Sequence, residues 1–402
     1  MRIAIFHHLP SGGAKRTLQE QTRRLTMRHG VDVYTLTNAE HEFADLRPFA
    51  TRHRAYDFRS LPLLSSPFGR LNQAIRWIDL LRLERVYKRV AIDIEQTGYD
   101  VLLAHPCQIE QAPSVMYFVN RLPVVYYCHE PLRLIYERMP YRPYDQAELK
   151  HRQLLNRFDP LPGIYRAKLQ RNDRRNTRAA RLVLVNSDFT RAAVKCTYDV
   201  EAQVSYHGID ARVFRPLERI KQLMVLSVGS LTPLKGFDFV IRAVAHISMD
   251  QRPRLTIASN FQNPAERIYL EDLAISLGVD TQFLTNISDD CLVEHYNEAV
   301  VTAYAPVSEP FGLVPLESMA CGTPVVAVRE GGISESVVHG GTGLLVEREP
   351  AQFAQAIMQL LEDANLAAEL GKRGREHVLK NWTWERAIAS LEKHLNNATS
   401  LH

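Results

Sequence analysis

Short apolar runs alternate along this chain with longer stretches whose apolar residues recur at helical spacing. The chain opens with a buried run at 2–6, a helical pattern at 17–29 and a second buried run at 31–36. A strand–helix–strand opening of this kind predicts a parallel sheet covered by helices. Similar short runs follow at 101–104, 124–127 and 182–185, and then at 224–228, 255–258, 300–303, 325–328 and 344–346.

Two successive arrays of similar size predict two doubly wound α/β domains. The polar segment 206–222 lacks periodicity, and apolar residues keep helical spacing at 384–396. We therefore expect domains at 1–205 and 206–384 and a terminal helix within 385–402. Ligands of such domains bind at the carboxyl ends of the strands, and the motifs described below follow predicted strands.

The segment that follows the run at 300–303 predicts an anion site at a helix N-terminus. Pro315 suits the first position of a helix, and Gly322 suits the residue just past its end. Backbone N–H groups at the start of a helix lack intrahelical partners and bind anions such as phosphate. The predicted phosphate cradle consists of Phe311, Gly312, Leu313 and Val314.

Two glutamates flank this cradle. Glu309 lies before the turn, and Glu317 is expected in the first helical turn. A phosphate cradle between two carboxylates suits a sugar nucleotide, whose sugar and ribose hydroxyls the carboxylates would bind. The helix dipole alone also favours a glutamate in a first turn, so Glu317 has a purely structural interpretation. Glu309, beside Pro310, has no capping role.

This segment resembles the donor-site signature of glycosyltransferase family 4, the retaining enzymes of the two-domain GT-B fold. Two glutamates eight positions apart, Phe311-Gly312 between them and Gly-Thr-Pro-Val-Val after them are all present. The resemblance extends over nearly the whole chain. It implies an acceptor domain at 1–205, a sugar-nucleotide domain at 206–384, a central cleft, and a terminal helix that crosses back to the first domain.

Gly12 and Gly13 follow the first predicted strand. The glycines allow a ligand to approach the backbone, although a plain tight turn explains them as well. The sequence matches neither the dinucleotide fingerprint nor the P-loop. It resembles the Gly-Gly loop of the family, which lies near the diphosphate or the acceptor. We expect the adjacent Lys15 and Arg16 to be solvated helix residues.

His129 directly follows the predicted strand at 124–127. A lone histidine is usually structural, but the family carries a histidine at this place, close to the reacting sugar. The resemblance implies that His129 forms hydrogen bonds to the donor sugar or the acceptor and is not a general base. His7, His8 and His105 are left as structural or unassigned.

Lys235 lies in a segment that resembles the family's Gly-Arg…Lys-Gly pattern, in which both cations hold the departing diphosphate. The arginine is replaced here by Ser230, which can donate a hydrogen bond but supplies no charge. The resemblance therefore predicts a donor site in which Lys235 and the backbone N–H groups carry more of the diphosphate charge.

Four further segments complete the resemblance. Ile287 lies in a loop similar to one that contacts the nucleotide base through main-chain groups. Asn186 and Ser187 follow the run at 182–185 and either line the rear of the cleft or cap the next helix. His207 stands where relatives have asparagine in the segment between domains, and the turn at 331–335 is expected to be structural.

Charge is distributed unevenly. Residues 1–205 contain 32 Lys and Arg against 21 Asp and Glu, whereas the remainder contains 17 against 24. A basic first half suits an anionic lipid or a phosphate-bearing acceptor. Nucleic acid is disfavoured because no helix-turn-helix, zinc-finger or RNA-recognition signature accompanies the charge. The stretch 68–90 mixes apolar and basic residues and either lies on an anionic membrane or packs on the first sheet as an ordinary helix.

The cysteine content and the hydropathy of the chain indicate the cellular compartment. Five scattered cysteines predict a reducing compartment without a disulfide framework. The apolar run at the N-terminus is too short for a signal peptide, and no stretch approaches 18 apolar residues. We expect a cytoplasmic protein, with peripheral contact to the inner face of the membrane as an option.

The resulting prediction is a retaining glycosyltransferase that moves a hexose from GDP-mannose or a UDP-sugar to a glycan or lipid-linked acceptor in surface polysaccharide or glycoconjugate synthesis. Lacking an Asp-x-Asp motif or a metal cluster, it is expected to need no metal or other cofactor. Two alternatives remain: an epimerase or hydrolase of the same fold, and a non-catalytic partner that binds sugar nucleotides.

Overall fold

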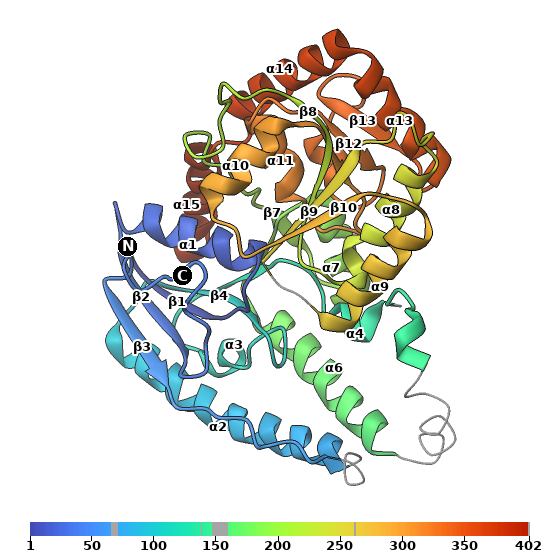
Figure 1. Cartoon of the computed structure of the whole chain (residues 1–402). Coiled ribbons are helices and arrows are strands. Elements are labelled where there is room, and N and C mark those ends of the chain that lie inside the picture. Colours follow the sequence, from blue (N-terminus) through green and yellow to red (C-terminus); the bar gives the residue numbers. More distant parts are fainter. Residues whose placement is uncertain (66–70, 138, 147–159, 261–262, 401–402) are drawn as a thin grey trace.

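Two parallel sheets follow one another along the chain (Figure 1). The computed structural model describes residues 1–65, 71–137, 139–146, 160–260 and 263–400. The first sheet has seven strands in the order β3-β2-β1-β4-β5-β6-β7, and the second has six in the order β10-β9-β8-β11-β12-β13. All pairings between neighbouring strands are parallel, as the alternating pattern predicts.

The first domain comprises the strands and helices that precede residue 205. Its strands are β1 (Arg2–His8), β2 (Gly30–Leu36), β3 (Arg52–Tyr56), β4 (Val101–Cys107), β5 (Val124–Cys128), β6 (Leu182–Val185) and β7 (Ala202–Val204). Its helices are α1 (Gly13–Leu25), α2 (Asn72–Thr97), α3 (Val115–Phe118), α4 (Arg133–Tyr136), α6 (Leu161–Ala179) and α7 (Asp188–Tyr198), with a 3-10 turn η2 (Pro143–Gln146).

The second domain follows the same plan. Its strands are β8 (Gln222–Val228), β9 (Arg254–Ser259), β10 (Thr281–Thr285), β11 (Ala299–Tyr304), β12 (Val325–Val328) and β13 (Gly343–Val346). Its helices are α8 (Phe237–Ala245), α9 (Pro264–Ser276), α10 (Asp289–Glu298), α11 (Leu313–Ala320), α12 (Ile333–Ser336), α13 (Pro350–Glu362) and α14 (Ala364–Asn381), with a 3-10 turn η3 (Pro233–Lys235). The last helix is α15 (Trp384–Ser400).

The predicted strands are confirmed, those at 182–185 and 325–328 without any change of bounds. Three strands went unpredicted, namely β3, β7 and β10, and each lies at the edge of a sheet. An edge strand is covered less completely than a central one, so its sequence lacks a continuous apolar run. The Arg-His-Arg-Ala-Tyr sequence of β3, half-exposed along its length, illustrates this.

Alternate side chains of the first sheet face two separate cores. Ala4 and Phe6 of β1 pack with α2, α3 and α7, whereas Ile3 and Ile5 pack with α1 and α15. This division follows from the two-residue period of a strand buried on both faces. The apolar cluster of the second domain extends from 209 to 382 and includes no residue of the first sheet.

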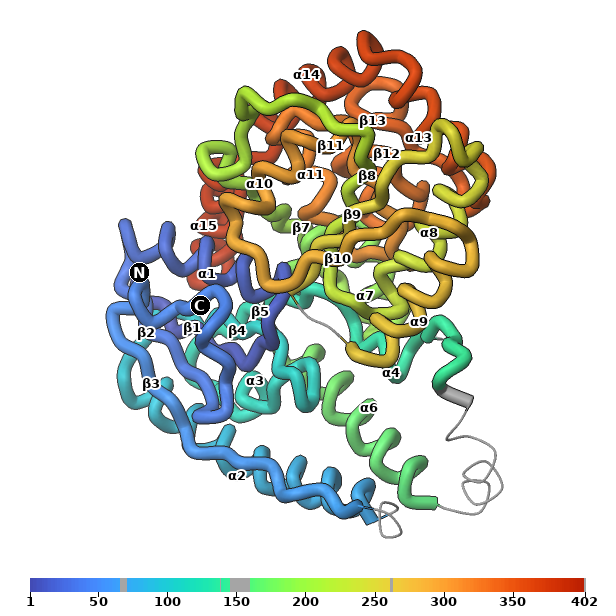
Figure 2. The backbone as a smooth tube through the Cα atoms, viewed as in Figure 1, coloured from blue at the N-terminus to red at the C-terminus, as the bar shows by residue number. Residues whose placement is uncertain are grey.

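Helix α15 returns from the end of the second domain to the first sheet, as the resemblance implied. Trp384, Ile388, Leu391 and Leu395 are buried in the same core as Ile3 and Ile5. Figure 2 shows both chain ends beside the first sheet, with α15 next to α1. Within the described residues, no helix has the length and apolar character needed to cross a membrane.

Candidate functional site

The predicted phosphate cradle is a turn between β11 and α11. Gly312 has φ +88° and caps the helix, which begins at Leu313. Pro315 is therefore the third helical residue, and its predicted place at the first position is wrong. Since proline has no N–H, the available donors are those of Gly312, Leu313 and Val314, for which the described part of the chain provides no acceptor. Gly322 follows the helix with φ +77°, as predicted.

Glu309 is held by the turn at 331–332. The N–H of Gly332 donates to the Glu309 carbonyl oxygen at 2.8 Å. Gly331 has φ +64°, and a Cβ there would overlap the backbone of Glu309. The turn that sequence reasoning assigned a structural role thus fixes the backbone beneath a predicted catalytic carboxylate.

Lys235 lies opposite Glu309, at the end of η3. Its Nζ is 2.7 Å from Glu309 Oε2, and the side chains are 25% and 14% exposed. The following Gly236 has φ +66° and lies against the Ala305 carbonyl group, where a side chain would not fit. Ser230 is half-buried in the same loop after β8. The structure therefore brings Lys235, Ser230 and Glu309 to the carboxyl edge of the second sheet.

Glu317 is buried in the second turn of α11, so its predicted place in the first turn is wrong. The Tyr296 hydroxyl donates to Glu317 Oε2 at 2.8 Å, and Arg16 Nη1 lies 3.8 Å from Oε1. Burial raises the pKa of Glu317, an effect that the Arg16 guanidinium opposes. Because Tyr296 and Arg16 contact the Glu317 carboxylate, a favourable interaction with the helix dipole is not the only reason for a glutamate at this position.

The Gly-Gly loop comes from the first domain and reaches this turn. A Cβ on Gly13 would lie 3.3 Å from Leu313 Cδ1, so the glycine permits the two domains to approach. Helix α1 begins at Gly13, four residues before its predicted start.

The earlier start of α1 overturns the prediction that Lys15 and Arg16 are solvated. Lys15 is fully buried with its Nζ 2.7 Å from Glu40 Oε2. Arg16 crosses to the second domain, where its Nη2 lies 2.6 Å from Asp289 Oδ1.

His129 follows β5 and is buried among aromatic rings. Its Nε2 lies 3.2 Å from His105 Nδ1, and its ring centroid is 4.9 Å from that of Tyr127. His207 stacks on Tyr127 from another side and meets Phe311 edge-on at 5.1 Å. Burial lowers the pKa of His129 to about 3, so the ring is neutral at physiological pH.

Ser187 caps α7, one of the two interpretations that the sequence left open, and also contacts the second domain. Its hydroxyl oxygen accepts the Thr190 N–H at 2.9 Å and so caps α7, and the hydroxyl donates to the Pro310 carbonyl oxygen at 2.5 Å. Glu335 accepts the N–H groups of Asp188 and Phe189 at 2.9 and 3.0 Å. The segment that leads into the turn between β11 and α11 is thereby fastened to the first domain.

A second connection lies beside η3. Arg142 of the first domain donates from Nε to Glu266 Oε2 and from Nη2 to Asp238 Oδ1, both at 2.9 Å. Glu266 is fully buried, and Arg142 is nearly so. Arg142 Nη2 also lies 3.4 Å from the Pro233 carbonyl oxygen, two residues before Lys235.

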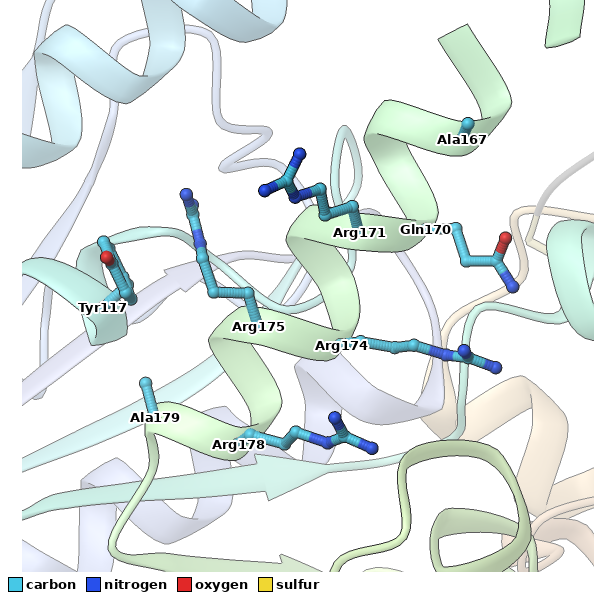
Figure 3. A pocket seen from close by; sticks show the side chains of 8 residues that line it. All are labelled: Tyr117, Ala167, Gln170, Arg171, Arg174, Arg175, Arg178 and Ala179. Atoms are coloured by element: carbon cyan, nitrogen blue, oxygen red, sulfur yellow. The ribbon is translucent and has the colours of Figure 1, made fainter. Parts of the chain in front are cut away.

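Ile287 is half-buried between β10 and α10 and packs against the core of the second domain. No group of three metal-ligating side chains is present in the described ranges. A pocket of about 670 Å³ opens instead on the outer side of α6, lined by Tyr117 and four arginines and by none of the predicted site residues (Figure 3).

Sequence reasoning missed Arg16, His105 and Tyr296 as members of the site. His105 had a usable signal, because it lies near the carboxyl end of β4 and His129 directly follows the neighbouring β5. Arg16 and Tyr296 had none, since each meets Glu317 only through the packing of one domain on the other or of α10 on α11.

Two family models together cover most of the chain. A model described as Glycosyltransferase Family 4 matches residues 11–213, and one described as Glycosyl transferases group 1 matches residues 210–377. A D-inositol 3-phosphate glycosyltransferase of Nocardiopsis dassonvillei is 28% identical over 95% of this chain and 88% of its own length. A second protein of that description, from Acidothermus cellulolyticus, is 39% identical over 46% of this chain and 45% of its own length.

The solved structures that resemble this one show the fold alone, because their identities are low. Sucrose-phosphate synthase from Thermosynechococcus elongatus has a TM-score of 0.76 at 21% identity and covers 100% of both chains. HepE from Anabaena, in complex with UDP and glucose, has a TM-score of 0.74 at 20% identity, with 98% of this chain and 99% of that one covered. Both are consistent with the two parallel-sheet domains described above.

Proposed function

The chain belongs to Glycosyltransferase Family 4, and on this premise we propose that it transfers a hexose from a nucleoside-diphosphate sugar to a hydroxyl-bearing acceptor with retention of configuration. The observation that carries the proposal is the Lys235–Glu309 pair beside the N–H groups of the turn between β11 and α11, which we call the donor turn and whose N–H groups find no acceptor among the described residues. The Lys235 ammonium group and the backbone N–H groups can bind a diphosphate. The Glu309 carboxylate can accept hydrogen bonds from sugar hydroxyls.

In the proposed reaction the bond between the sugar C1 and the diphosphate oxygen breaks, and a bond from C1 to the acceptor oxygen forms on the same face. The acceptor proton leaves with the departing diphosphate. Lys235 and the N–H groups of Gly312, Leu313 and Val314 stabilise the charge that develops on that diphosphate. Each preorganised donor of this kind is worth roughly 2.7–4 kcal/mol, so they substitute for a metal and for the absent arginine at Ser230.

Binding requires the ion pair to exchange partners. Lys235 turns from Glu309 to the diphosphate, while Glu309 accepts hydroxyl groups of the transferred sugar. Glu317 accepts the ribose hydroxyls, Ile287 contacts the base, and Gly12 and Gly13 allow the diphosphate to approach. His129 bonds to the sugar.

Whether the nucleotide of the donor is UDP or GDP is left open. The relatives include a human alpha-1,3/1,6-mannosyltransferase, ALG2, which is 26% identical over 69% of this chain and 68% of its own length, whereas HepE is solved with UDP-glucose. A thermal-shift screen of UDP-, GDP- and dTDP-sugars, followed by turnover with and without added EDTA, tests the proposal. Release of free sugar or of an epimer without acceptor would favour the epimerase or hydrolase alternative, and an absence of any sugar-nucleotide binding would favour the non-catalytic one.

We further propose that the acceptor is lipid-linked and that the outer face of α2 and α6 meets an anionic membrane. These helices lie side by side below the first sheet (Figure 1). The second half of α2 packs on the sheet, which supports the ordinary-helix alternative for that part. The first half exposes Trp77 and Ile78 by 38% and 43%, and Ile164 of α6 is 52% exposed. Residues 68–70 of the predicted stretch 68–90 lie outside the described residues.

Helix α6 also carries positive charge, which an anionic surface requires. Figure 3 shows arginine side chains spreading from successive turns of α6, with Arg175 over the Tyr117 ring at 4.1 Å. The pocket arginines are Arg171, Arg174, Arg175 and Arg178. Each basic residue near an anionic surface contributes about 1 kcal/mol.

Co-sedimentation with phosphatidylglycerol vesicles, compared with neutral vesicles, tests the membrane proposal. Arg171→Glu combined with Trp77→Ser should abolish binding at moderate salt. Arg386→Glu, which reverses an exposed charge on α15, should not change it. Equal binding of wild type and the double variant would remove this face from the proposal.

A further inference from the structure

His105 and His129 form a buried pair at the ends of two neighbouring strands. Strands β4 and β5 pair with Ala104 opposite Tyr126, so His105 lies beside Tyr127, and His129 follows Tyr127 by two residues on the same side. The His105 ring is fully buried and stacks on Tyr127 with centroids 5.4 Å apart and planes 6° from parallel. Its Nδ1 lies 3.2 Å from His129 Nε2.

Both rings are neutral, and the 3.2 Å contact between their nitrogens requires that one of the two donates a proton to the other. Burial lowers the pKa of His129 to about 3 and that of His105 well below its ordinary value. A neutral imidazole has one donor and one acceptor nitrogen. The contact therefore has two forms, in which either His105 Nδ1–H or His129 Nε2–H donates.

The other nitrogen of His105 distinguishes the two forms. Its Nε2 is buried and finds no hydrogen-bond partner among the described residues. If His129 donated, His105 would carry its proton on Nε2 as a buried N–H without an acceptor. Orphaned buried N–H groups are rarer in proteins than under-satisfied acceptors, so the form in which His105 Nδ1–H donates is favoured.

We propose that His105 is a positioning residue that holds His129 as its Nδ1–H tautomer. His129 Nδ1 has no partner in the described part of the protein and is not among the buried, unpaired nitrogens. It therefore presents an N–H to the ligand. Resting on the function proposed above, this makes His129 a hydrogen-bond donor to a sugar hydroxyl oxygen and removes it as a base for the acceptor.

A neighbouring contact fixes the proton of a third histidine, His207. The Tyr127 hydroxyl donates to the Ser205 carbonyl oxygen, and it lies 3.1 Å from His207 Nδ1. Because a hydroxyl has a single proton, His207 must donate to Tyr127 from Nδ1. Tyr127, which stacks on both His105 and His207, thus fixes His207 in the Nδ1–H tautomer.

Nitrogen NMR of histidine-labelled protein tests the proposal without any substrate. We expect His129 with a protonated Nδ1 and a bare Nε2, assigned by the loss of its signals in His129→Asn. His105→Asn, which keeps a donor near the Nδ1 position, should preserve that pattern, and His105→Phe should shift His129 toward the Nε2–H form. An Nε2–H form in the wild type, or an unchanged Nδ1–H form in a folded His105→Phe variant, overturns the proposal.

Turnover provides the second readout. The amide nitrogen of asparagine can occupy the place of histidine Nδ1, and that of glutamine the place of Nε2. We therefore expect His129→Asn to retain more kcat than His129→Gln, with a separation on the order of tenfold or more, since a single positioned donor contributes up to about 10²–10³-fold. The reverse order contradicts the proposal. If the wild type neither binds nor turns over any sugar nucleotide, the proposed function fails while the NMR result still decides the tautomer.

Discussion

Lys235 and Glu309 form an ion pair, with Nζ 2.7 Å from Oε2, although 74 residues separate them in the chain. Both side chains are partly exposed, so the pair adds little to the free energy of unfolding. Its position beside the turn between β11 and α11 instead fits the proposal that these charges are arranged for a ligand. Substitutions in the pair should therefore separate activity from stability.

We predict that Lys235→Ala lowers kcat/KM by about 10²–10³-fold, the loss expected for one preorganised donor to a developing anion. The free energy of unfolding should change by less than about 1 kcal/mol. Steady-state kinetics and urea unfolding measure the two quantities. Lys195→Ala, which breaks an exposed ion pair with Asp199, is the matched control and should leave both unchanged. Near wild-type turnover by Lys235→Ala would show that the site is misassigned.

Gly331 and Gly340 offer a paired test of how Glu309 is positioned. Both have positive φ, +64° and +71°, but a Cβ on Gly331 would overlap Glu309 whereas one on Gly340 would meet nothing within 4 Å. Each substitution by alanine costs roughly 1–2 kcal/mol in backbone strain. Only Gly331→Ala should also displace Glu309 and lower kcat by tenfold or more, because a displacement of about 1 Å can cost 10²-fold. Equal kcat values for the two folded variants would contradict this support role.

Arg16 joins the two domains at Glu317. We predict that Arg16→Ala raises the KM for the sugar nucleotide more than it lowers kcat, because Glu317 loses its cation and the Gly-Gly loop loses its contact with Asp289. Arg28→Ala, beyond the end of the same helix, removes an exposed cation that pairs with Glu392 and should leave KM unchanged. A fall in kcat alone would place Arg16 in the chemical step and not in donor binding.

The sequence predicted the fold well and the site incompletely, for physical reasons. Central strands such as β6 are apolar throughout and were located without error, whereas edge strands such as β3 carry polar residues and were missed. The helical start of α1 was placed four residues late, because its only cap is Gly12 and no side chain marks it.

Motifs identified the residues that we propose meet a ligand, but not the residues that hold them in place. Glu309 and Lys235 were found from short local patterns, and their mutual contact depends on how η3 lies against the donor turn. Arg16 was misjudged as solvated because its partners are in the other domain. Periodicity describes which face of a helix is covered, and it contains no information on which domain covers it.

Acid should destabilise the protein through its buried neutral histidines. Burial lowers the pKa of His207 well below its ordinary value, so between that pKa and about 6.5 only the unfolded chain is protonated there. Stability is then lost as pH falls, by about 1.4 kcal/mol per histidine for each pH unit below 6.5. Glu110, whose pKa burial raises to about 7, acts in the opposite direction because the folded state binds its proton.

His207→Asn isolates one of these contributions, since asparagine can also donate to Tyr127. We predict that the free energy of unfolding falls by about 1.4 kcal/mol less in the variant than in the wild type between pH 7.5 and pH 5.5. Urea unfolding at both pH values measures the difference. An identical loss in the two proteins would mean that His207 is protonated in the folded state, contrary to its burial against Phe311.

The Arg142–Glu266 contact predicts the largest loss of stability. Arg142 belongs to the first domain and Glu266 to the second, both are buried, and Nε lies 2.9 Å from Oε2. Removing one partner of such a pair leaves an uncompensated charge and costs about 3–5 kcal/mol. Arg142→Met should lower the free energy of unfolding by that amount, whereas Arg142→Met with Glu266→Gln should recover part of it because the charge is gone.

Urea unfolding of these variants compares the stability contributed by the buried Arg142–Glu266 pair with that of an exposed ion pair. Arg254→Ala, which breaks an exposed pair with Asp280 on the second domain, should cost no more than about 1 kcal/mol. Because Arg142 Nη2 also contacts the Pro233 carbonyl oxygen beside η3, its loss should weaken sugar-nucleotide binding as well. Should Arg142→Met prove as stable as Arg254→Ala, the Arg142–Glu266 pair would contribute no more to stability than a surface pair, which contradicts this prediction.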